Sequence, residues 1–346
     1  MSLDRALRII RLEETDRVGQ YENLDHPGLI EAVASCDPWE NPRQAFAEAF
    51  AALDMDWAGG LPTRSHRFAD GESSVDLGDG RRMTEWGITG SSWREDFAAH
   101  TVEEVLAYEP EVEIHVPDDP CAGIRSDQEF VGDATLITGI YYTTLFQHPI
   151  MTFGWELFLE AAAAEPERFQ RVLESFARVS RRHMEAWARN PPALTFIHDD
   201  VAMEQGMVFH PDWYRQRLFP LYEQVLEPVF QCADTRTCFV SDGDYTPVLP
   251  DLVALGFDGF VINDNMDLGE IARQLGADHF LAGNVRTSVL TLGRPEQVVR
   301  EVERCLEEAK PCAGHFIKAT RDLPHNIPLE NIRAYFDAVA ELGRRG

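Results

Sequence analysis

The stretch TCFVSDGDYTPVLPDLVALGFDGFVINDN, residues 237–265, contains the same pattern twice. An apolar run ends in Ser-Asp-Gly-Asp, a helix-like segment follows, and a second apolar run ends in Asn-Asp-Asn. Strands that alternate with helices form a parallel sheet, and their carboxyl ends then lie at one edge of that sheet. The stretch therefore predicts a cluster of carboxylate and amide side chains at the carboxyl edge of a parallel sheet.

The same alternation continues on both sides of this stretch. Residues 131–346 contain five or six strand-and-helix units, and residues 1–130 contain at least one more. This number favours a closed eight-stranded barrel over an open sheet. We expect one α/β domain over residues 1–346, a (β/α)8 TIM barrel. The first 130 residues would supply an N-terminal elaboration of helices and a β-hairpin, together with the first barrel elements.

Two local patterns refine this expectation. Short strand-like pieces around a Gly-Asp-Gly turn predict a β-hairpin whose tip is Asp79-Gly80. The apolar run ITGIYYTTLFQH, residues 137–148, predicts a strand before a long helical segment. Both features lie on the N-terminal side of the regular units.

The charge of the chain is strongly negative. Lys and Arg number 31 against 59 Asp and Glu, which gives a formal net charge of -28. Such a surface repels nucleic acid and anionic membranes, so we expect neither as a partner. Residues 1–18 lack the apolar core of a signal peptide, and no segment approaches the roughly 20 apolar residues of a membrane span. We expect a cytoplasmic protein whose six Cys are reduced thiols.

Polar residues follow each of the late apolar runs, where a barrel carries its chemistry. Paired acids in this set repel each other unless a cation, a proton or a basic side chain lies between them. A local role is an equal alternative for each residue alone: Asp264 as a helix cap, Asp244 as a turn residue, and Asn284 as a partner of backbone groups. The set comprises His198, Asp199, Asp200, Ser241, Asp242, Asp244, Asn263, Asp264, Asn265, Asn284, Arg286, Lys318, Thr320 and Arg321.

Long segments of the chain resemble the uroporphyrinogen decarboxylase superfamily. The segments are residues 197–229, 239–260, 281–308 and 314–339, and the opening ALRIIRLEETDRV and the TEWGI sequence also fit. The resemblance covers nearly the whole chain and implies a (β/α)8 barrel. It also implies one of two chemistries, decarboxylation of a tetrapyrrole or corrinoid-dependent methyl transfer.

Both specialised forms of the superfamily's site are missing from the sequence. True decarboxylases carry an N-terminal arginine segment that binds the acidic tetrapyrrole, whereas the matching region GQYENLDHPGLIEAV, residues 19–33, has no arginine. Thiol-methylating members hold zinc with a His-x-Cys pair and a later Cys. The pair's positions look like Val240 and Asp242 here, and the last-strand position near Thr320 has no Cys.

The resemblance therefore implies a methyltransferase that moves a methyl group from a small methylated substrate, such as a methyl ether or amine, to a corrinoid on a separate protein. We expect His198, Asp200 and Asp242 to be catalytic and to be the ligands of a divalent metal, zinc first, with magnesium, manganese and calcium open. A uroporphyrinogen decarboxylase-type enzyme and a non-catalytic binding barrel are the alternatives. The expected substrate-binding residues are Asp199, Asp244, Asn263, Asn284, Lys318 and His325.

Overall fold

The fold is built around one parallel sheet. A computed structural model of the chain describes residues 2–65, 72–78, 81–89, 91–94 and 97–345. Seven strands pair in the order β1-β15-β14-β13-β12-β9-β8. The strands of the barrel are β1 (Gly19–Gln20), β3 (Trp57–Ala58), β7 (Leu136–Ile137), β8 (Gly139–Tyr141), β9 (Leu194–His198), β12 (Arg236–Val240), β13 (Gly259–Val261), β14 (Phe280–Ala282) and β15 (His315–Ile317).

The sheet curls until its two edges meet. A parallel bridge joins Tyr21, just after β1, to Trp57 of β3. β3 in turn pairs with β7, and only Thr138 separates β7 from β8. If β7 and β8 count as one bent strand, the described residues form a ring of eight parallel strands. The predicted (β/α)8 barrel is confirmed.

Large side chains fill the interior of this barrel. Tyr21 and Trp57 stack with ring centroids 3.9 Å apart, and Phe196 and Phe316 meet the Trp57 ring edge-on. Together with smaller residues of the other strands they form a buried cluster that also includes Ile9 of α1. The cluster makes the interior a solid core, so a ligand can enter only at the mouth beyond the strand ends.

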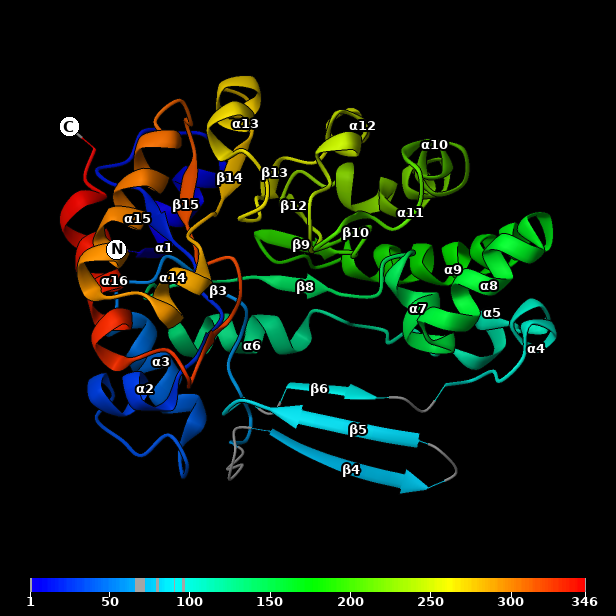
Figure 1. The fold of residues 1–346 in the computed structure, drawn as a ribbon, viewed down its shortest axis with the longest axis horizontal. Coiled ribbons are helices and arrows are strands. Elements are labelled where there is room, and N and C mark those ends of the chain that lie inside the picture. The colour runs from blue at the N-terminus through cyan, green and yellow to red at the C-terminus, as the bar shows by residue number, and fades with distance from the viewer. Residues whose placement is uncertain (1, 66–71, 79–80, 90, 95–96, 346) are drawn as a thin grey trace.

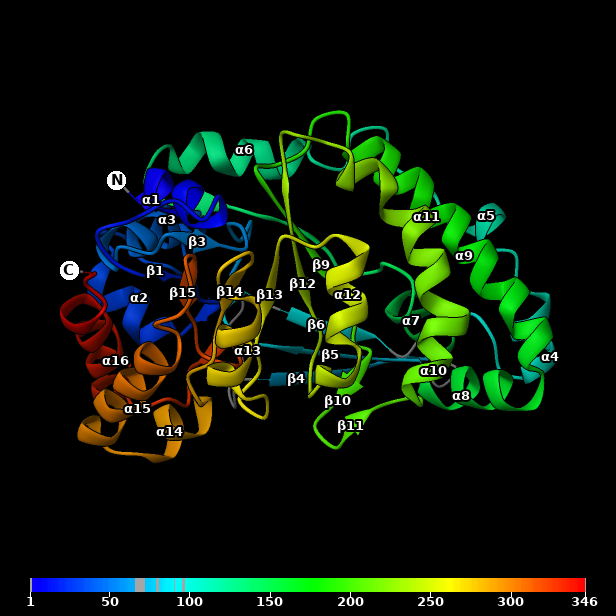
Figure 2. The same cartoon turned by 90° about the horizontal axis from the view of Figure 1, so that it is seen from above.

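Helices surround the barrel, and α1 covers the amino ends of its strands (Figure 2). A second, larger apolar cluster packs the helices against the outward-facing strand residues. The helices are α1 (Ser2–Ile10), α2 (Pro27–Val33), α3 (Pro42–Ala52), α4 (Val102–Ala107), α5 (Pro110–Glu113), α6 (Ala122–Val131), α7 (Gln147–Phe153), α8 (Trp155–Ala164), α9 (Pro166–Trp187), α10 (Pro211–Trp213), α11 (Phe219–Phe230), α12 (Leu249–Leu255), α13 (Leu268–Leu275), α14 (Thr287–Leu292), α15 (Pro295–Glu308) and α16 (Leu329–Leu342). A π-helical turn, η1 (Tyr214–Leu218), and a 3-10 turn, η2 (Thr246–Val248), complete the set.

The remaining strands form small sheets outside the ring. β2 (Leu24–Asp25) pairs with β16 (Leu323–Pro324), and β10 (Ala202–Met203) pairs with β11 (Gly206–Met207). β4 (Glu72–Gly78), β5 (Arg81–Trp86) and β6 (Ser91–Arg94) form an antiparallel layer that lies beside the barrel (Figure 1). The predicted hairpin is confirmed by β4 and β5, and its predicted tip, Asp79-Gly80, lies outside the described residues.

The strand predicted over residues 137–148 is wrong in its second half. β8 ends at Tyr141, and α7 begins at Gln147. The cause is a long-range contact: the buried Asp199 carboxylate accepts the backbone N–H groups of Leu145, Phe146 and Gln147 and so fixes the start of the helix. A local apolar pattern contains no signal for such a contact.

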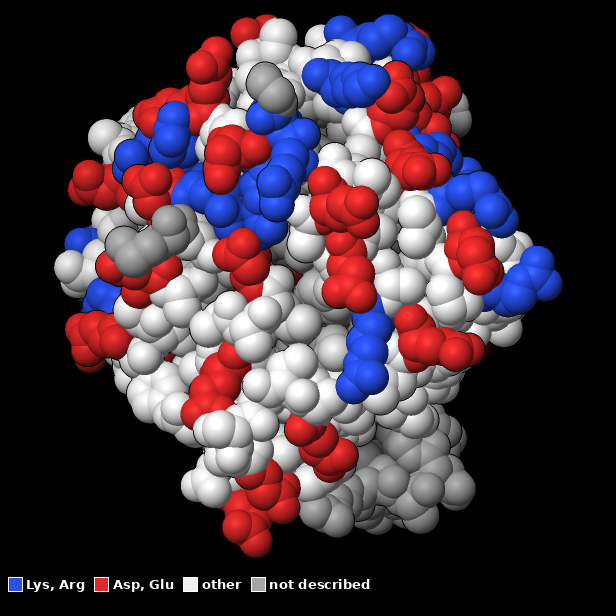
Figure 3. Space-filling view, turned by 90° about the vertical axis from the view of Figure 1, so that its left-hand side faces the viewer, with Lys and Arg blue, Asp and Glu red and all other residues white. Residues whose placement is uncertain are grey.

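Acidic side chains dominate the sequence, and basic ones lie among them on the surface. Figure 3 shows the face that carries the two ends of the chain, where Lys and Arg gather in the upper half beside Asp and Glu. Near the carboxyl end of α15, Arg304 pairs with Glu308 at 2.6 Å, and Lys310, just after the helix, pairs with Glu307 at 2.5 Å. Basic side chains that already have acidic neighbours are poor contacts for phosphate backbones.

Candidate active site

A cavity of about 330 Å³ opens beyond the carboxyl ends of β9 and β12. Its wall combines residues that follow these two strands with side chains from the β4–β6 layer, the loop after β8, α7 and α8. The lining residues are Trp93, Tyr142, Gln147, Trp155, Asp200, Ala202, Met203, Glu204, Gln205, Asp242 and Arg321. Barrel enzymes carry their chemistry at this end of the barrel. The cavity is therefore the candidate active site.

A hydrogen-bonded pair of His198 and Asp200 forms one side of the site. Alternate residues of a strand face the same way, so His198 follows Phe196 toward the barrel axis. His198 Nε2 lies 2.9 Å from Asp200 Oδ1, and the backbone N–H of Asp242 donates to that same oxygen at 2.9 Å. The Tyr142 hydroxyl lies 3.5 Å from the other carboxylate oxygen. The imidazole is thus held in one orientation by a fixed carboxylate.

The charges in this pair follow from their surroundings. Burial alone would raise the pKa of Asp200, but the hydrogen bond and charge of His198 and the Asp242 N–H hold that pKa below its ordinary value. Asp200 is therefore a carboxylate at neutral pH. Burial, followed by the charges of Asp200 and Asp242, raises the pKa of the Tyr142 phenol well above its ordinary value. Tyr142 consequently remains a protonated hydrogen-bond donor.

Asp242 stands opposite, paired with Arg321. An oxygen of its carboxylate lies 3.0 Å from an Arg321 guanidinium nitrogen, and both side chains are about half exposed. The repulsion expected between the acids of this mouth is therefore relieved by basic side chains, Arg321 for Asp242 and the His198 imidazole for Asp200. A basic side chain between paired acids was one of the three possibilities stated from the sequence, beside a cation and a proton.

Asp199 faces away from the cavity, although it was predicted to bind substrate. It is fully buried, and besides the start of α7 it accepts a hydrogen bond from the Tyr222 hydroxyl at 2.5 Å. Burial raises the pKa of Asp199 to about 6, against these donors, which lower it. The reason for its position is the period of two: Asp199 follows His198 and points to the opposite face of the strand. Its contacts fix the start of α7. Substrate binding by Asp199 stays a prediction, and the burial of its carboxylate away from the cavity does not favour it.

Lys318 is buried just beneath the mouth, at the end of β15. Its ammonium lies 5.3 Å from the centre of the Tyr21 ring and donates to the Ala319 carbonyl at 2.7 Å. Burial lowers its pKa, against the negative charges of Glu22 and nearby aspartates, including Asp242. Burial also raises the pKa of Glu22 to about 8, although Lys318 and the Tyr335 hydroxyl oppose the shift. Lys318 does not line the cavity.

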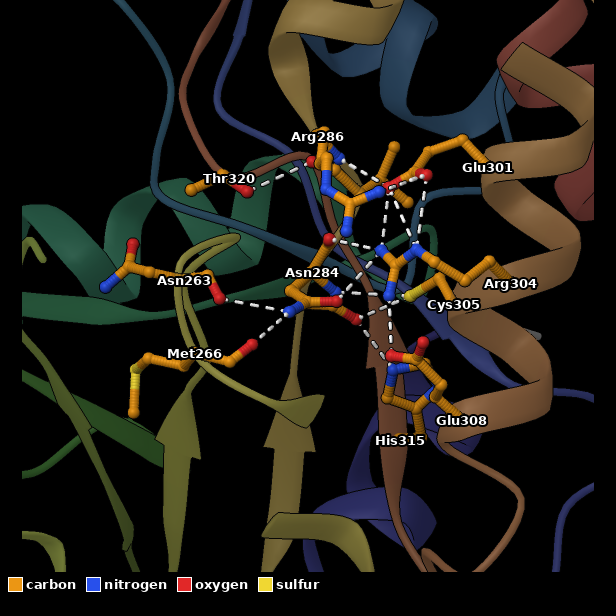
Figure 4. Close-up of polar contacts among 12 residues, drawn as sticks. Asn263, Met266, Asn284, Arg286, Glu301, Arg304, Cys305, Glu308, His315 and Thr320 are labelled. Atoms are coloured by element: carbon orange, nitrogen blue, oxygen red, sulfur yellow. Dashed lines mark hydrogen bonds and ion pairs between the residues drawn. The ribbon is translucent and has the colours of Figure 1, made fainter. Parts of the chain in front are cut away.

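Asn263 and Asn284 are held in a closed network (Figure 4). The Asn263 amide donates to the carbonyls of Ser241 and Gly243 at 2.7 and 2.9 Å. The Asn284 amide donates to the Asn263 carbonyl at 3.0 Å and accepts from Arg304 at 3.1 Å. These contacts fix the loops after β12, β13 and β14, so the alternative of a backbone-supporting role is observed for Asn284.

Three further residues lie away from the cavity. Asp244 accepts the backbone N–H of Thr246 at 2.9 Å, the turn role that was its alternative. Asp264 is exposed, and the cap of α13 is instead Asp267, which accepts the N–H of Glu270 at 2.9 Å. His325 is exposed on the loop after β16. Substrate binding by Asp244 and His325 stays a prediction without support from the cavity's lining.

The predicted metal ligands, His198, Asp200 and Asp242, each contact another side chain. Among the described residues, no group of three or more His, Cys, Asp or Glu side chains is placed to hold a metal ion. His198 and Asp200 are bonded to each other, and the Asp242 carboxylate is bonded to Arg321. Because the His198 imidazole and both carboxylates already have side-chain partners, the three residues as arranged here do not fit a zinc, magnesium, manganese or calcium site.

Eight of the eleven described lining residues were not among the predicted site residues. Ala202, Met203, Glu204 and Gln205 lie just after Asp200, on the polar segment that follows β9. The other four come from elsewhere. Trp93, Tyr142, Gln147 and Trp155 all belong to the part of the chain before the regular units or to its first loop and helices. Tyr142 had a usable signal, because it directly follows the β-type run that ends at Tyr141. Trp93 had none, since its place in the wall depends on how the β4–β6 layer packs beside the barrel.

Comparison with known proteins identifies the family. The model described as uroporphyrinogen decarboxylase (URO-D) matches residues 149–342, just over half of the chain. The chain belongs to the uroporphyrinogen decarboxylase family. The uroporphyrinogen decarboxylase of Alkalilimnicola ehrlichii is 28% identical over 185 residues, which are 52% of this chain and 49% of that protein. The protein of the same name from Shewanella halifaxensis is 23% identical over 196 residues, 56% of this chain and 53% of its own length.

This chain spans about half the length of these relatives. Among solved structures, a methyltransferase from Methanosarcina mazei covers 99% of this chain and 98% of its own, with a TM-score of 0.64 and 18% sequence identity. That likeness concerns the fold of the whole chain. In the part of the chain that the structure describes, none of the helices has the length and apolar character to cross a membrane.

Proposed function

We propose that this protein is a methyltransferase that moves a methyl group from a small methylated substrate to a corrinoid carried by a separate protein. The observation that carries the proposal is the size and charge of the mouth cavity. About 330 Å³ is at the small end of the roughly 300–1,000 Å³ typical of ligand sites. Its described lining has three carboxylates, on Asp200, Glu204 and Asp242, and one basic side chain, Arg321.

The residues of the cavity suit a methyl donor bound beside a proton donor. When a methyl group leaves a neutral ether, the C–O bonding electrons stay on oxygen, and a proton must neutralise that oxygen. We assign the supply of this proton to His198, which is not itself in the cavity's lining but is hydrogen-bonded to the lining residue Asp200, and the protonated Tyr142 lies beside them. The electron pair for the new bond comes from the reduced corrinoid, which is the acceptor in this reaction. The cavity needs no metal ligand set for these roles.

Decarboxylation of uroporphyrinogen is the second candidate, supported by the family and by the names of the relatives. The cavity argues against it. A tetrapyrrole with many carboxylates needs a large basic site, whereas this site is small and carries more acidic than basic groups. Residues 19–33, where the decarboxylases carry arginines, contain none. A non-catalytic barrel is the third candidate, and it gives no role to the partly buried His198–Asp200 pair beside the cavity.

The first test is the activity of the purified chain. Methyl transfer to free cob(I)alamin is followed by its absorbance change, with a panel of methyl ethers and methylated amines as donors. We expect methylcobalamin to form with at least one donor, and no coproporphyrinogen to form from uroporphyrinogen under anaerobic conditions. Coproporphyrinogen production, with no methyl transfer from any donor, would make the decarboxylase the correct assignment.

A further inference from the structure

The cavity has an aromatic wall as well as carboxylates. Trp93, Tyr142 and Trp155 come from three separate elements, β6, the loop after β8, and the start of α8, and all line the same space. Met203 adds a polarisable side chain that is 44% exposed. Aromatic faces attract cations through their negative quadrupole, and Trp does so most strongly. A wall of this composition favours a positively charged ligand.

The charge balance of the lining points the same way. Within the described lining, Arg321 pairs with Asp242, Asp200 has only the imidazole of His198 as a basic partner, and Glu204 adds a third carboxylate, so acidic groups outnumber basic ones. Asp200 is held ionised by His198 and by the Asp242 N–H. An anionic ligand would be repelled by these carboxylates, and a neutral one would gain at most hydrogen bonds from them, without charge–charge attraction. A cation is attracted by both the rings and the acids.

Gln147 supplies an independent sign of a ligand. It lines the cavity, is 2% exposed, and its side-chain oxygen has no hydrogen-bond partner among the described residues. A buried acceptor without a partner costs free energy unless a donor is supplied from outside the protein. A ligand that carries an N–H or O–H group would meet this requirement.

We infer that the cavity binds a small methylated ammonium compound, with its cationic head between the aromatic rings and Asp200. This inference rests on the proposed methyl transfer and names its donor. An ammonium donor also simplifies the chemistry. The corrinoid's electron pair forms the new bond to the methyl carbon, the C–N bonding pair stays on nitrogen, and a neutral amine leaves without needing a proton. His198 then serves by fixing the charge of Asp200.

Binding of choline and of 3,3-dimethylbutan-1-ol tests this inference. The two molecules have the same shape, and only choline is charged. Calorimetry on the full chain should show choline binding at least about tenfold more tightly, a difference of about 1.4 kcal/mol. Trp155→Leu and Asp200→Asn should each weaken choline binding about tenfold and leave the neutral alcohol nearly unchanged. Asp264→Asn removes the same charge from an exposed position outside the cavity and should change neither.

Gln147 is tested with a second pair of probes. Protonated N,N-dimethylethanolamine carries an N–H on its ammonium nitrogen, and choline does not. Gln147→Met should therefore weaken binding of the protonated amine more than binding of choline. If Gln147→Met weakened binding of the two molecules equally, Gln147 would not contact the N–H of the ligand's ammonium group.

The inference fails if both molecules of the first pair bind equally, or if neither binds. Because binding requires no corrinoid, its failure is distinguishable from failure of the proposed function. Methyl transfer from a neutral ether without choline binding would overturn only the ammonium inference. Choline binding without methyl transfer from any donor would instead overturn the methyl transfer.

Discussion

The two sides of the barrel mouth use similar residues to different ends. On the open side, around His198, Asp200, Asp242 and Arg321, the polar side chains form two pairs beside a cavity, linked through the Asp242 backbone N–H. On the sealed side, around Asn263, Asn284, Glu301 and Arg304, they form a continuous network. On both sides the polar residues come directly after apolar strands. This sequence pattern alone therefore does not distinguish residues that line a cavity from residues that hold loops in place.

The difference lies in how completely the hydrogen-bonding groups are satisfied. Asn284 uses its amide on the carbonyls of Asn263 and Met266 and its oxygen on Arg304. Gln147, on the open side, has an oxygen without a partner. Buried polar groups are normally paired within the protein, so an exception beside a cavity marks a place for a ligand. Unpaired buried atoms also occur away from the cavity, for example His315 Nδ1 and Asn331 Oδ1, so an unpaired atom marks the site only where its residue also lines the cavity, as Gln147 does.

The largest effect is expected from Asp200→Asn on the open side. Asn keeps an acceptor for the Asp242 N–H but loses the charge that holds His198 and faces the ligand. We expect methyl transfer to fall by several hundredfold, within the roughly 10²–10⁴ range for groups of this kind, with the melting temperature nearly unchanged. Steady-state rates with cob(I)alamin give the measurement, and a loss below about fivefold would move the site elsewhere.

On the sealed side, Asn284→Ala should act on stability instead. The change leaves the Asn284 side-chain bonds to the carbonyls of Asn263 and Met266 unmade and removes one of several contacts of Arg304, and we expect a cost of about 2 kcal/mol in the free energy of unfolding. The rate per folded molecule should stay within about twofold. Urea unfolding measures the loss, with Asn265→Ala, an exposed neighbour, as the matched control. An equal loss in the control would show that the network contributes nothing.

The pKa of Glu22 predicts a pH dependence near the sealed side. Burial raises it to about 8, so the stabilising effect is complete below the unfolded-state pKa of about 4.3 and is lost as pH rises toward 8. Glu22→Gln cannot ionise and should flatten this decline between pH 5 and 8. Urea midpoints across that range provide the test, with exposed Glu330→Gln as control. Parallel slopes in wild type and Glu22→Gln would contradict the raised pKa.

The smallest effect is expected from Asp244→Asn. Asp244 shares a loop with Asp242 but only accepts the Thr246 N–H, and Asn can make the same contact in a turn. Stability should change by less than about 0.5 kcal/mol and methyl transfer by less than about twofold. A loss comparable to that of Asp200→Asn would return Asp244 to the substrate-binding set.

The sequence predicts the barrel well because its signal is periodic. Alternating strands and helices recur from β8 to α16, and closure follows from their number. It predicts His198, Asp200 and Asp242 as neighbours for the same reason. The alternation of side chains along a strand could also have excluded Asp199 from the predicted site residues. Counting in steps of two from the buried Phe196 places His198 and Asp200 inward and Asp199 outward.

The rest of the site depends on contacts between distant segments. Trp93 reaches the cavity from a separate layer, and Arg321 meets Asp242 across 79 positions of the chain. The start of α7 depends on Asp199, more than 50 residues later. Pairings of this kind leave no local pattern in the sequence. For the same reason the sequence did not show that Asp242, a predicted metal ligand, pairs with Arg321.

The most direct test of the central claim compares Asp242→Asn with Asp264→Asn. Both changes remove one carboxylate from the loops at the same end of the barrel, but only Asp242 lines the cavity. The measurement is the rate of methyl transfer to cob(I)alamin at matched melting temperatures. The account predicts a loss on the order of a hundredfold for Asp242→Asn and none for Asp264→Asn. Equal rates in the two variants, within about threefold of wild type, would contradict it.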